Sequence, residues 1–176
     1  GITGAADILD FDNPGGNDVR AAIEAVETSV PEARNAEAVK EKLPAIFGNQ
    51  KIVGGVQAAN GEFPFIVSLQ TSYGSHFCGG SLIRKNWVLT AAHCVEGGYL
   101  GSVVIGLHTL SNLAGTEKFT AAQVIKHPNW DSAVMDYDFA LIRLDKESGF
   151  LPVALNPKEL TGQVNFVTTG WGTTSE

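Results

Sequence analysis

Several features are scarce in this chain of 176 residues, and each scarcity excludes a class of protein. There are only two cysteines, which excludes a small scaffold held together by many disulfides. No apolar run approaches the length of about 18 residues that a membrane-spanning helix requires. Basic residues are also few: 12 lysines and arginines against 19 acidic residues give a net charge of -7. This charge argues against a nucleic acid or an anionic membrane as partner.

Two short signals are missing as well. The sequence contains no N-x-S/T acceptor, so we do not expect N-glycosylation. No positively charged, apolar leader opens the chain, and we therefore expect that any secretory signal either has been removed or was never part of this sequence. Glycine, in contrast, is abundant with 20 residues, and 44% of the chain is hydrophobic. This composition is typical of a globular, soluble protein rich in turns.

The chain divides near residue 51 into two parts of different composition. Residues 1–51 carry nine acidic and five basic side chains but no cysteine, tryptophan or tyrosine. Apolar residues at helical spacing predict one helix over residues 19–30. Ser29 and Glu32 fit a capping box, which predicts a second helix over residues 31–43. We interpret this part as a small, acidic, helical domain.

From residue 52 onward, short β-type runs bounded by glycine, proline and asparagine replace the helical pattern. Strands at such spacing are typical of a sandwich or a barrel, and periodicity alone leaves both open. We therefore expect residues 52–176 to form a separate, all-β part. The runs that best fit strands are 65–69, 87–90, 103–105, 119–125, 139–144 and 164–168.

Five short motifs follow one another in this second part. They are Ile52-Val53-Gly54-Gly55, Cys78-Gly79-Gly80-Ser81-Leu82, Thr90-Ala91-Ala92-His93-Cys94, Asp138-Phe139-Ala140-Leu141 and Gly170-Trp171-Gly172. Found together in this order, they resemble the trypsin/chymotrypsin family of serine proteases over residues 52–176. The resemblance implies a six-stranded antiparallel barrel over about residues 65–145. The first strand of the second barrel of a chymotrypsin-like double β-barrel should follow it.

One motif of the family is not found. No Gly-Asp-Ser-Gly-Gly occurs among the 176 residues, so the nucleophilic serine is not in this chain. The part from residue 52 is also shorter than the about 200 to 250 residues of a complete enzyme of this type. We expect the serine to lie in a remainder beyond Glu176, present as a separate C-terminal chain if the protein is nicked there. The chain alone would then be inactive.

The resemblance assigns catalytic roles to His93 and Asp138. Serine attack on a peptide needs a base within reach of the hydroxyl, and a carboxylate that fixes the tautomer of the base and stabilises its imidazolium. The order of histidine before aspartate matches the chymotrypsin arrangement and excludes that of subtilisin. Asp136 is a rival, but Asp138 directly precedes an apolar run that can carry it inward. The remaining histidines are expected to be surface or loop residues: His76, His108 and His127.

The resemblance also implies a disulfide between Cys78 and Cys94, and with it an oxidising, extracellular compartment for a secreted protein. This bond would close a loop of about 15 residues and stabilise the fold by about 3 kcal/mol. It would join the strand before His93 to a helical turn after it, and so help to hold the base in place.

Cleavage between Lys51 and Ile52 is the activation step that the resemblance implies. In the family, the freed amino group inserts and pairs with a carboxylate next to the catalytic serine. Residues 1–51 would then be a propeptide, and the chain would be a zymogen activated by a protease that accepts lysine. The propeptide could alternatively assist folding or inhibit the enzyme.

We expect no cofactor and no metal. Some members of the family bind calcium in a surface loop, but the matching segment, residues 107–117, contains Glu117 as its only carboxylate, which is too few for calcium. Protein or peptide substrates are the expected partners. The alternative function is that of a catalytically inactive homologue acting as a binding module, because fold does not fix function.

Overall fold

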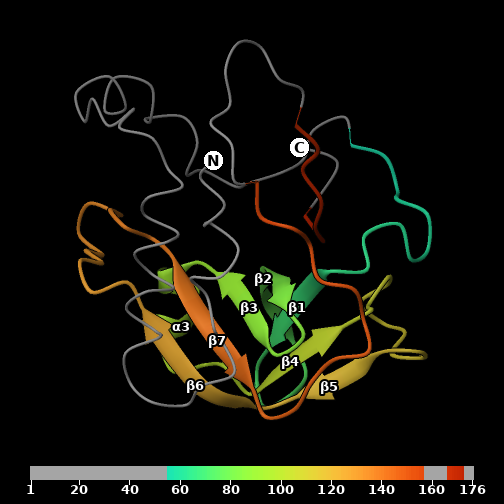
Figure 1. Cartoon of the computed structure of the whole chain (residues 1–176), viewed down its shortest axis with the longest axis horizontal. Helices are drawn as coiled ribbons and strands as arrows, with labels where there is room; N and C mark the ends of the chain where they lie inside the picture. Colours follow the sequence, from blue (N-terminus) through green and yellow to red (C-terminus); the bar gives the residue numbers. More distant parts are fainter. Residues whose placement is uncertain (1–54, 157–165, 173–176) are drawn as a thin grey trace, which may run out of the picture. The chain divides into compact units, whose positions relative to one another are not determined.

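Figure 1 shows the chain as a computed structural model, in which residues 55–156, 166–172 are described. The predicted helices over 19–30 and 31–43, and the Lys51–Ile52 bond, lie outside the described residues. The described part consists of an antiparallel sheet and one short helix within one compact unit. Its elements are β1 (Ile66–Gln70), β2 (His76–Arg84), β3 (Trp87–Thr90), α3 (Ala92–Glu96), β4 (Ser102–Ile105), β5 (Glu117–Phe119), β6 (Ala121–Lys126) and β7 (Ala140–Leu144).

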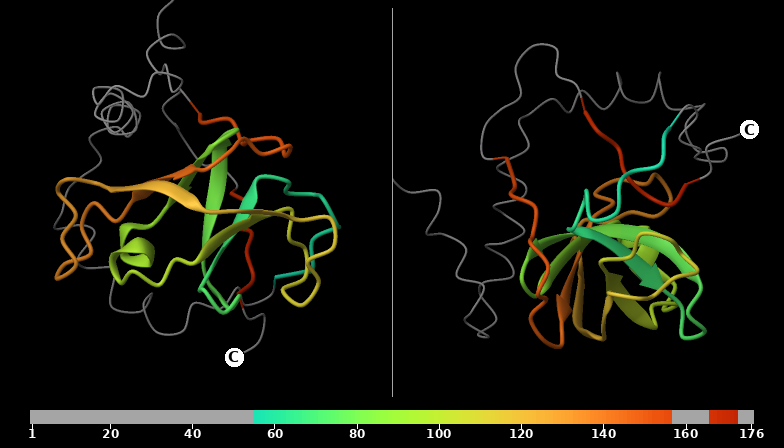
Figure 2. Two further views of the ribbon diagram at one scale, coloured as in Figure 1. Left: turned by 90° about the horizontal axis from the view of Figure 1, so that it is seen from below. Right: turned by 90° about the vertical axis from the view of Figure 1, so that its right-hand side faces the viewer.

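The sheet is curled so that its two edges are joined by the chain itself. Its strand order is β5-β4-β1-β2-β3-β7-β6, and all neighbouring strands are antiparallel. The edge strands β5 and β6 are separated in sequence by Thr120 alone, so the chain passes directly from one edge to the other. The curvature is visible in Figure 2. The expected all-β, antiparallel barrel is therefore confirmed.

Thr120 divides what we expected to be a single strand over residues 119–125. Its backbone N–H and its hydroxyl donate to the two carboxylate oxygens of Asp145, at 3.2 and 2.8 Å. The N–H of Asp145 in turn donates to the carbonyl of Thr120 at 3.1 Å. Because Asp145 engages both backbone groups of Thr120, the chain bends there. Counted as one bent strand, β5 and β6 complete the six strands expected.

Strand β2 was not among the predicted strands, because Gly79 and Gly80 interrupt its apolar pattern. The structure gives the reason for the second glycine. A Cβ atom on Gly80 would lie 2.9 Å from both the carbonyl oxygen of Leu89 and the Cγ1 of Val88. Glycine at this position therefore allows β2 and β3 to approach closely.

The strand predicted over residues 164–168 is not observed in its described part. Residues 166–168 have no strand structure, and Phe166 and Val167 are 73% and 77% exposed. A strand requires a hydrogen-bonded neighbour, and among the described residues none pairs with this segment. Residues 164 and 165 lie outside the described ranges.

The hydrophobic core is one cluster of side chains from six strands and α3. Its members alternate along the strands, as in Val67 and Leu69 of β1, and the polar residues on the other face of β1, Ser68 and Gln70, are buried too. Among the residues that the structure describes, the chain forms no helix with the length and hydrophobicity of a membrane span. The core residues are Val67, Leu69, Leu82, Val88, Cys94, Val103, Ile105, Phe119, Ile142 and Leu144.

Candidate active site

The register of two neighbouring strands brings His93 and Asp138 together. Strand β3 pairs with β7, and Thr90 at the end of β3 lies opposite Ala140 at the start of β7. His93 follows Thr90 by three residues, on α3, and Asp138 precedes Ala140 by two. Two residues that are 45 positions apart in sequence therefore leave the sheet at the same point.

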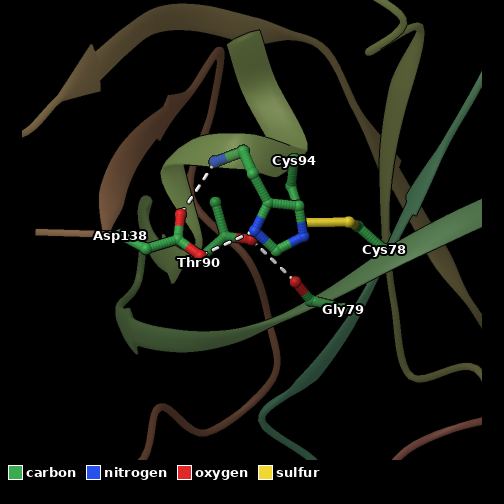
Figure 3. The surroundings of a disulfide bond; sticks show 6 residues. Cys78, Gly79, Thr90, Cys94 and Asp138 are labelled. Carbon is green, nitrogen blue, oxygen red and sulfur yellow. Dashed lines mark hydrogen bonds and ion pairs between the residues drawn. A yellow bond between two sulfur atoms is a disulfide. The ribbon is translucent and has the colours of Figure 1, made fainter. Parts of the chain in front are cut away.

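Both carboxylate oxygens of Asp138 bond to His93. The backbone N–H of His93 donates to Oδ1 at 2.9 Å, and the ring nitrogen Nδ1 lies 2.7 Å from Oδ2 (Figure 3). An ionised carboxylate can only accept, so Nδ1 carries a proton and Nε2 of the neutral ring keeps its lone pair. The His93 side chain is 49% exposed, which leaves its ring accessible. The arrangement can hold a base in one tautomer.

Asp136, the rival carboxylate, has a different partner. Its Oδ1 accepts a hydrogen bond from the backbone N–H of Tyr137 at 2.9 Å, and its backbone pairs with that of Asp131. Of the two aspartates considered from sequence, Asp138 is the one that contacts His93.

A disulfide anchors the helix that carries His93. Cys78 of β2 and Cys94 of α3 are bonded, with 6.0 Å between their Cα atoms (Figure 3). The expected pairing is thus present in the structure. The helix has five residues and no side-chain cap at Ala91, so it would be marginal alone. The disulfide and the Asp138 carboxylate, which accepts a first-turn N–H, supply what a local cap would otherwise provide.

Thr90 ties the strand before this helix to β2. Its hydroxyl donates to the carbonyl of Gly79 at 2.7 Å, and the residue is only 6% exposed (Figure 3). The next residue in β2 toward its start is Cys78. The hydroxyl bond and the disulfide therefore fix the two ends of the turn that leads to His93.

His93 and the two cysteines place three potential metal-ligating atoms within 4.8 Å of one another. The sulfur atoms are joined in a disulfide, however, and a cysteine binds metal as a thiolate. In this oxidised form the cluster therefore has only the histidine nitrogen to offer. Nε2 of His93 lies 3.4 Å from Sγ of Cys94.

His127 lies in the loop after β6, as expected, but it is not a surface residue. Its exposed fraction is 3%, and its ring lies between those of Tyr137 and Phe139. The sequence gives one signal: His127 directly follows the run that forms β6, so it begins next to the sheet. Its aromatic neighbours are ten and twelve residues further on, and sequence spacing did not reveal that contact.

His76 differs from the expectation of a surface or loop residue: it is the first residue of β2 and is partly buried. Its Nδ1 lies 2.8 Å from the hydroxyl of Ser68, and its ring packs edge-on against Trp171 with 5.2 Å between centroids. Partial burial lowers the pKa of His76 below its ordinary value. His108 lies in a loop, as expected, and its carbonyl accepts a hydrogen bond from the Trp171 indole N–H at 3.1 Å.

The comparisons with known proteins agree with this geometry. The family model described as "Trypsin" matches residues 52–176. Chymotrypsin-like elastase family member 1 of Rattus norvegicus is 41% identical over 138 residues, covering 72% of this chain and 52% of that protein. The Homo sapiens protein of the same name is 39% identical, with 72% and 54% covered. The chain thus spans about half the length of these relatives.

A solved structure is similar as well. The structure titled "human heparin binding protein" matches with a TM-score of 0.55 and 32% identity, over 62% of this chain and 52% of that one. The family model covers well over half of the 176 residues. The chain therefore belongs to the trypsin family of trypsin/chymotrypsin-like serine proteases.

Proposed function

We propose that this chain is the first part of the zymogen of a secreted serine endopeptidase, with His93 as general base and Asp138 as the carboxylate that orients it. The observation that carries the proposal is the double contact: one oxygen of Asp138 holds the helix backbone and the other holds the ring of the same histidine, at 2.9 and 2.7 Å. A carboxylate bonded in this way fixes both the position and the tautomer of the base.

The chemistry of the pair follows from the protons that it can move. With Nδ1 protonated, Nε2 of His93 can take the proton of a serine hydroxyl as that oxygen attacks the peptide carbonyl. The same nitrogen then gives the proton to the leaving amine. Asp138 remains ionised and stabilises the imidazolium between these steps. The serine itself belongs to the remainder of the protein, either contiguous with this chain or as a separate C-terminal chain.

Residues 1–51 act in this proposal as a propeptide, and residues 52–176 as the first barrel and the beginning of the second. Cleavage after Lys51 frees the amino group of Ile52, and an activating protease that accepts lysine performs it. The propeptide contains no cysteine, and the two cysteines of the chain bond to each other. Nothing covalent would therefore retain the propeptide after cleavage.

The disulfide supports the proposed secretion, because such bonds form and persist in oxidising compartments. Protein or peptide substrates follow from the endopeptidase activity. The alternative, an inactive homologue serving as a binding module, finds support in the name of the similar structure, human heparin binding protein. Here a net charge of -7 disfavours a polyanionic partner, and the intact His93–Asp138 contact favours the enzyme.

The test begins with the full-length protein treated with a lysine-specific protease. A denaturing, non-reducing gel should show that residues 1–51 separate from the larger piece. Peptidase activity should appear after cleavage, and His93→Ala should lower kcat by several orders of magnitude while the protein still folds. Asp136→Asn is the matched control and should be mild.

Two outcomes would contradict the proposal. One is peptidase turnover of His93→Ala within about tenfold of the unmutated enzyme, which would remove His93 as the base. The other is a cleaved protein that carries its downstream serine region and still neither turns over peptides nor reacts with a serine-directed phosphonate. That result would favour the binding module.

A further inference from the structure

The loop that carries Asp138 is long, and its base is closed by backbone bonds. The chain leaves the sheet at the end of β6 and returns at the start of β7, as the loop between these strands in Figure 1 shows. At the base, the N–H of His127 donates to the carbonyl of Phe139 at 3.0 Å. Further out, the backbones of Asp131 and Asp136 exchange bonds of 3.1 and 3.2 Å. Backbone hydrogen bonds therefore join the two sides of this loop at its base and further out.

The residue before Asp138 has an uncommon backbone conformation. Tyr137 has φ of +51°, in the left-handed region that non-glycine residues rarely adopt. Such a conformation persists where surrounding contacts hold it. Two hydrogen bonds contribute: the Tyr137 N–H donates to the side-chain Oδ1 of Asp136 at 2.9 Å, and the Phe139 N–H donates to the Tyr137 carbonyl at 2.8 Å. This conformation sets the direction in which the chain presents Asp138.

The ring of His127 contacts both sequence neighbours of Asp138. It stacks on the Tyr137 ring with 4.6 Å between centroids and 4° between planes, and it lies against Phe139 at 4.5 Å and 48°. The ring is buried, and its Nδ1 accepts a hydrogen bond from the N–H of Asn129 at 3.2 Å, which limits its rotation. A single buried ring thus holds residues 137 and 139 while residue 138 reaches His93.

We propose that His127 is a positioning residue for Asp138: its ring stack fixes the strained turn at Tyr137 and thereby aims the carboxylate at His93. The proposal rests on the function proposed above for His93 and Asp138. The contribution of His127 is geometric, because a carboxylate that must bond a backbone N–H and a ring nitrogen at once tolerates little displacement. A misplacement of about 1 Å can cost about 10²-fold in rate.

The direct test is a spectroscopic one that does not need the serine. The proton on His93 Nδ1, held by the Asp138 carboxylate, should give a low-field resonance in the proton NMR spectrum of the unmutated chain. His127→Ala should broaden or abolish it. Val103→Ala is the matched control, since it removes a fully buried side chain from β4 and should keep the resonance.

Two further variants separate the ring from its hydrogen bond. His127→Phe keeps a flat ring and loses the acceptor, whereas His127→Asn keeps an acceptor and loses the ring. If stacking positions Asp138, the Phe variant keeps the resonance and the Asn variant loses it. Should His127→Ala fail to fold, this pair still decides the question. Loss in the Phe variant with retention in the Asn variant would overturn the proposal.

The kinetic readout is made on the activated, serine-bearing protein. His127→Ala should lower kcat by about 10²-fold with little change in KM, and His127→Phe should restore most of it. A sharp resonance and unchanged kcat in His127→Ala would leave His127 a purely structural role and overturn the proposal. The two proposals can fail separately. If His127→Ala loses the resonance but the unmutated, activated protein does not hydrolyse peptides, the proposed function is refuted and the positioning role of His127 stands.

Discussion

Two histidines in this molecule each contact an oxygen atom through Nδ1, but the two oxygen-bearing partners differ in charge. Nδ1 of His93 lies 2.7 Å from a carboxylate oxygen of Asp138, and Nδ1 of His76 lies 2.8 Å from the hydroxyl of Ser68. The carboxylate favours the tautomer with a proton on Nδ1, which is the tautomer that the role proposed for His93 needs. The hydroxyl carries no charge. It can donate to Nδ1 of a neutral ring, and its oxygen also accepts from Gln70 Nε2 at 3.3 Å.

The surroundings strengthen this difference. The His93 side chain is half exposed, whereas His76 is partly buried against Trp171 and its pKa is lowered by that burial. The contrast teaches that the partner and the exposure, rather than the residue type, separate the histidine proposed as the base from the one that packs within the sheet. The two sites are also joined, because the disulfide connects Cys78, two residues after His76, to Cys94, directly after His93.

The largest effect is expected where the charge of the His93 site is removed. Asp138→Asn keeps the size of the side chain but lets an amide N–H face Nδ1, which selects the wrong tautomer. In the triad of the chymotrypsin-type enzymes this change lowers kcat by about 10⁴-fold, and we expect a loss of that order in the activated protein. Peptide hydrolysis under single-turnover conditions measures it. A loss below about tenfold would mean that Asp138 does not set the tautomer.

The second effect is on the link between the two sites. Replacing both Cys78 and Cys94 with alanine should lower the free energy of unfolding by about 3 kcal/mol, from the loop entropy that the disulfide removes. The consequence should be unequal: β2 keeps its ladder with β1 and β3, whereas α3 loses its covalent anchor. Urea unfolding gives the first quantity, and amide exchange at residues 92–96 the second. Equal protection of α3 in both proteins would show that Asp138 alone holds the helix.

Ser68→Ala should weaken the His76 site without altering the other. The hydroxyl is fully buried and serves both His76 and Gln70, so its removal leaves two polar groups without this partner. Such a loss costs about 1 to 3 kcal/mol. Ser72→Ala, at an exposed position of the same hairpin, is the control and should change stability by no more than about 0.5 kcal/mol. Urea unfolding that ranks the two variants equally would contradict this assignment.

The sequence was sufficient for the features that depend on local motifs and insufficient for those that depend on distant partners. His93, Asp138 and the two cysteines belong to short, characteristic sequence motifs. The structure brings His93 together with Asp138 and Cys78 together with Cys94. The bend at Thr120 depends instead on Asp145, 25 residues away.

The failure to predict β2 and the failure to predict the burial of His127 have physical reasons of the same kind. Strand β2 was missed because Gly80 interrupts its apolar pattern at the point where the backbones of β2 and β3 approach closely. The burial of His127 depends on aromatic rings that only the fold brings to it. Sequence patterns report which face of an element is apolar, and they do not report which side chain from another segment covers it.

The smallest effect expected is a pH dependence that belongs to His76 alone. Because burial lowers its pKa in the folded protein, the unfolded chain binds more protons between that lowered value and the ordinary one of about 6.5. The free energy of unfolding should therefore fall as pH drops below about 6.5, and the loss is complete below the folded pKa. His76→Gln, which cannot titrate, should show a shallower fall between about pH 8 and pH 5 in urea unfolding. Comparing it with the parent cancels the other histidines. Parallel curves would mean that His76 is as easily protonated as it is in the unfolded chain, and its contrast with His93 would then be one of partner alone.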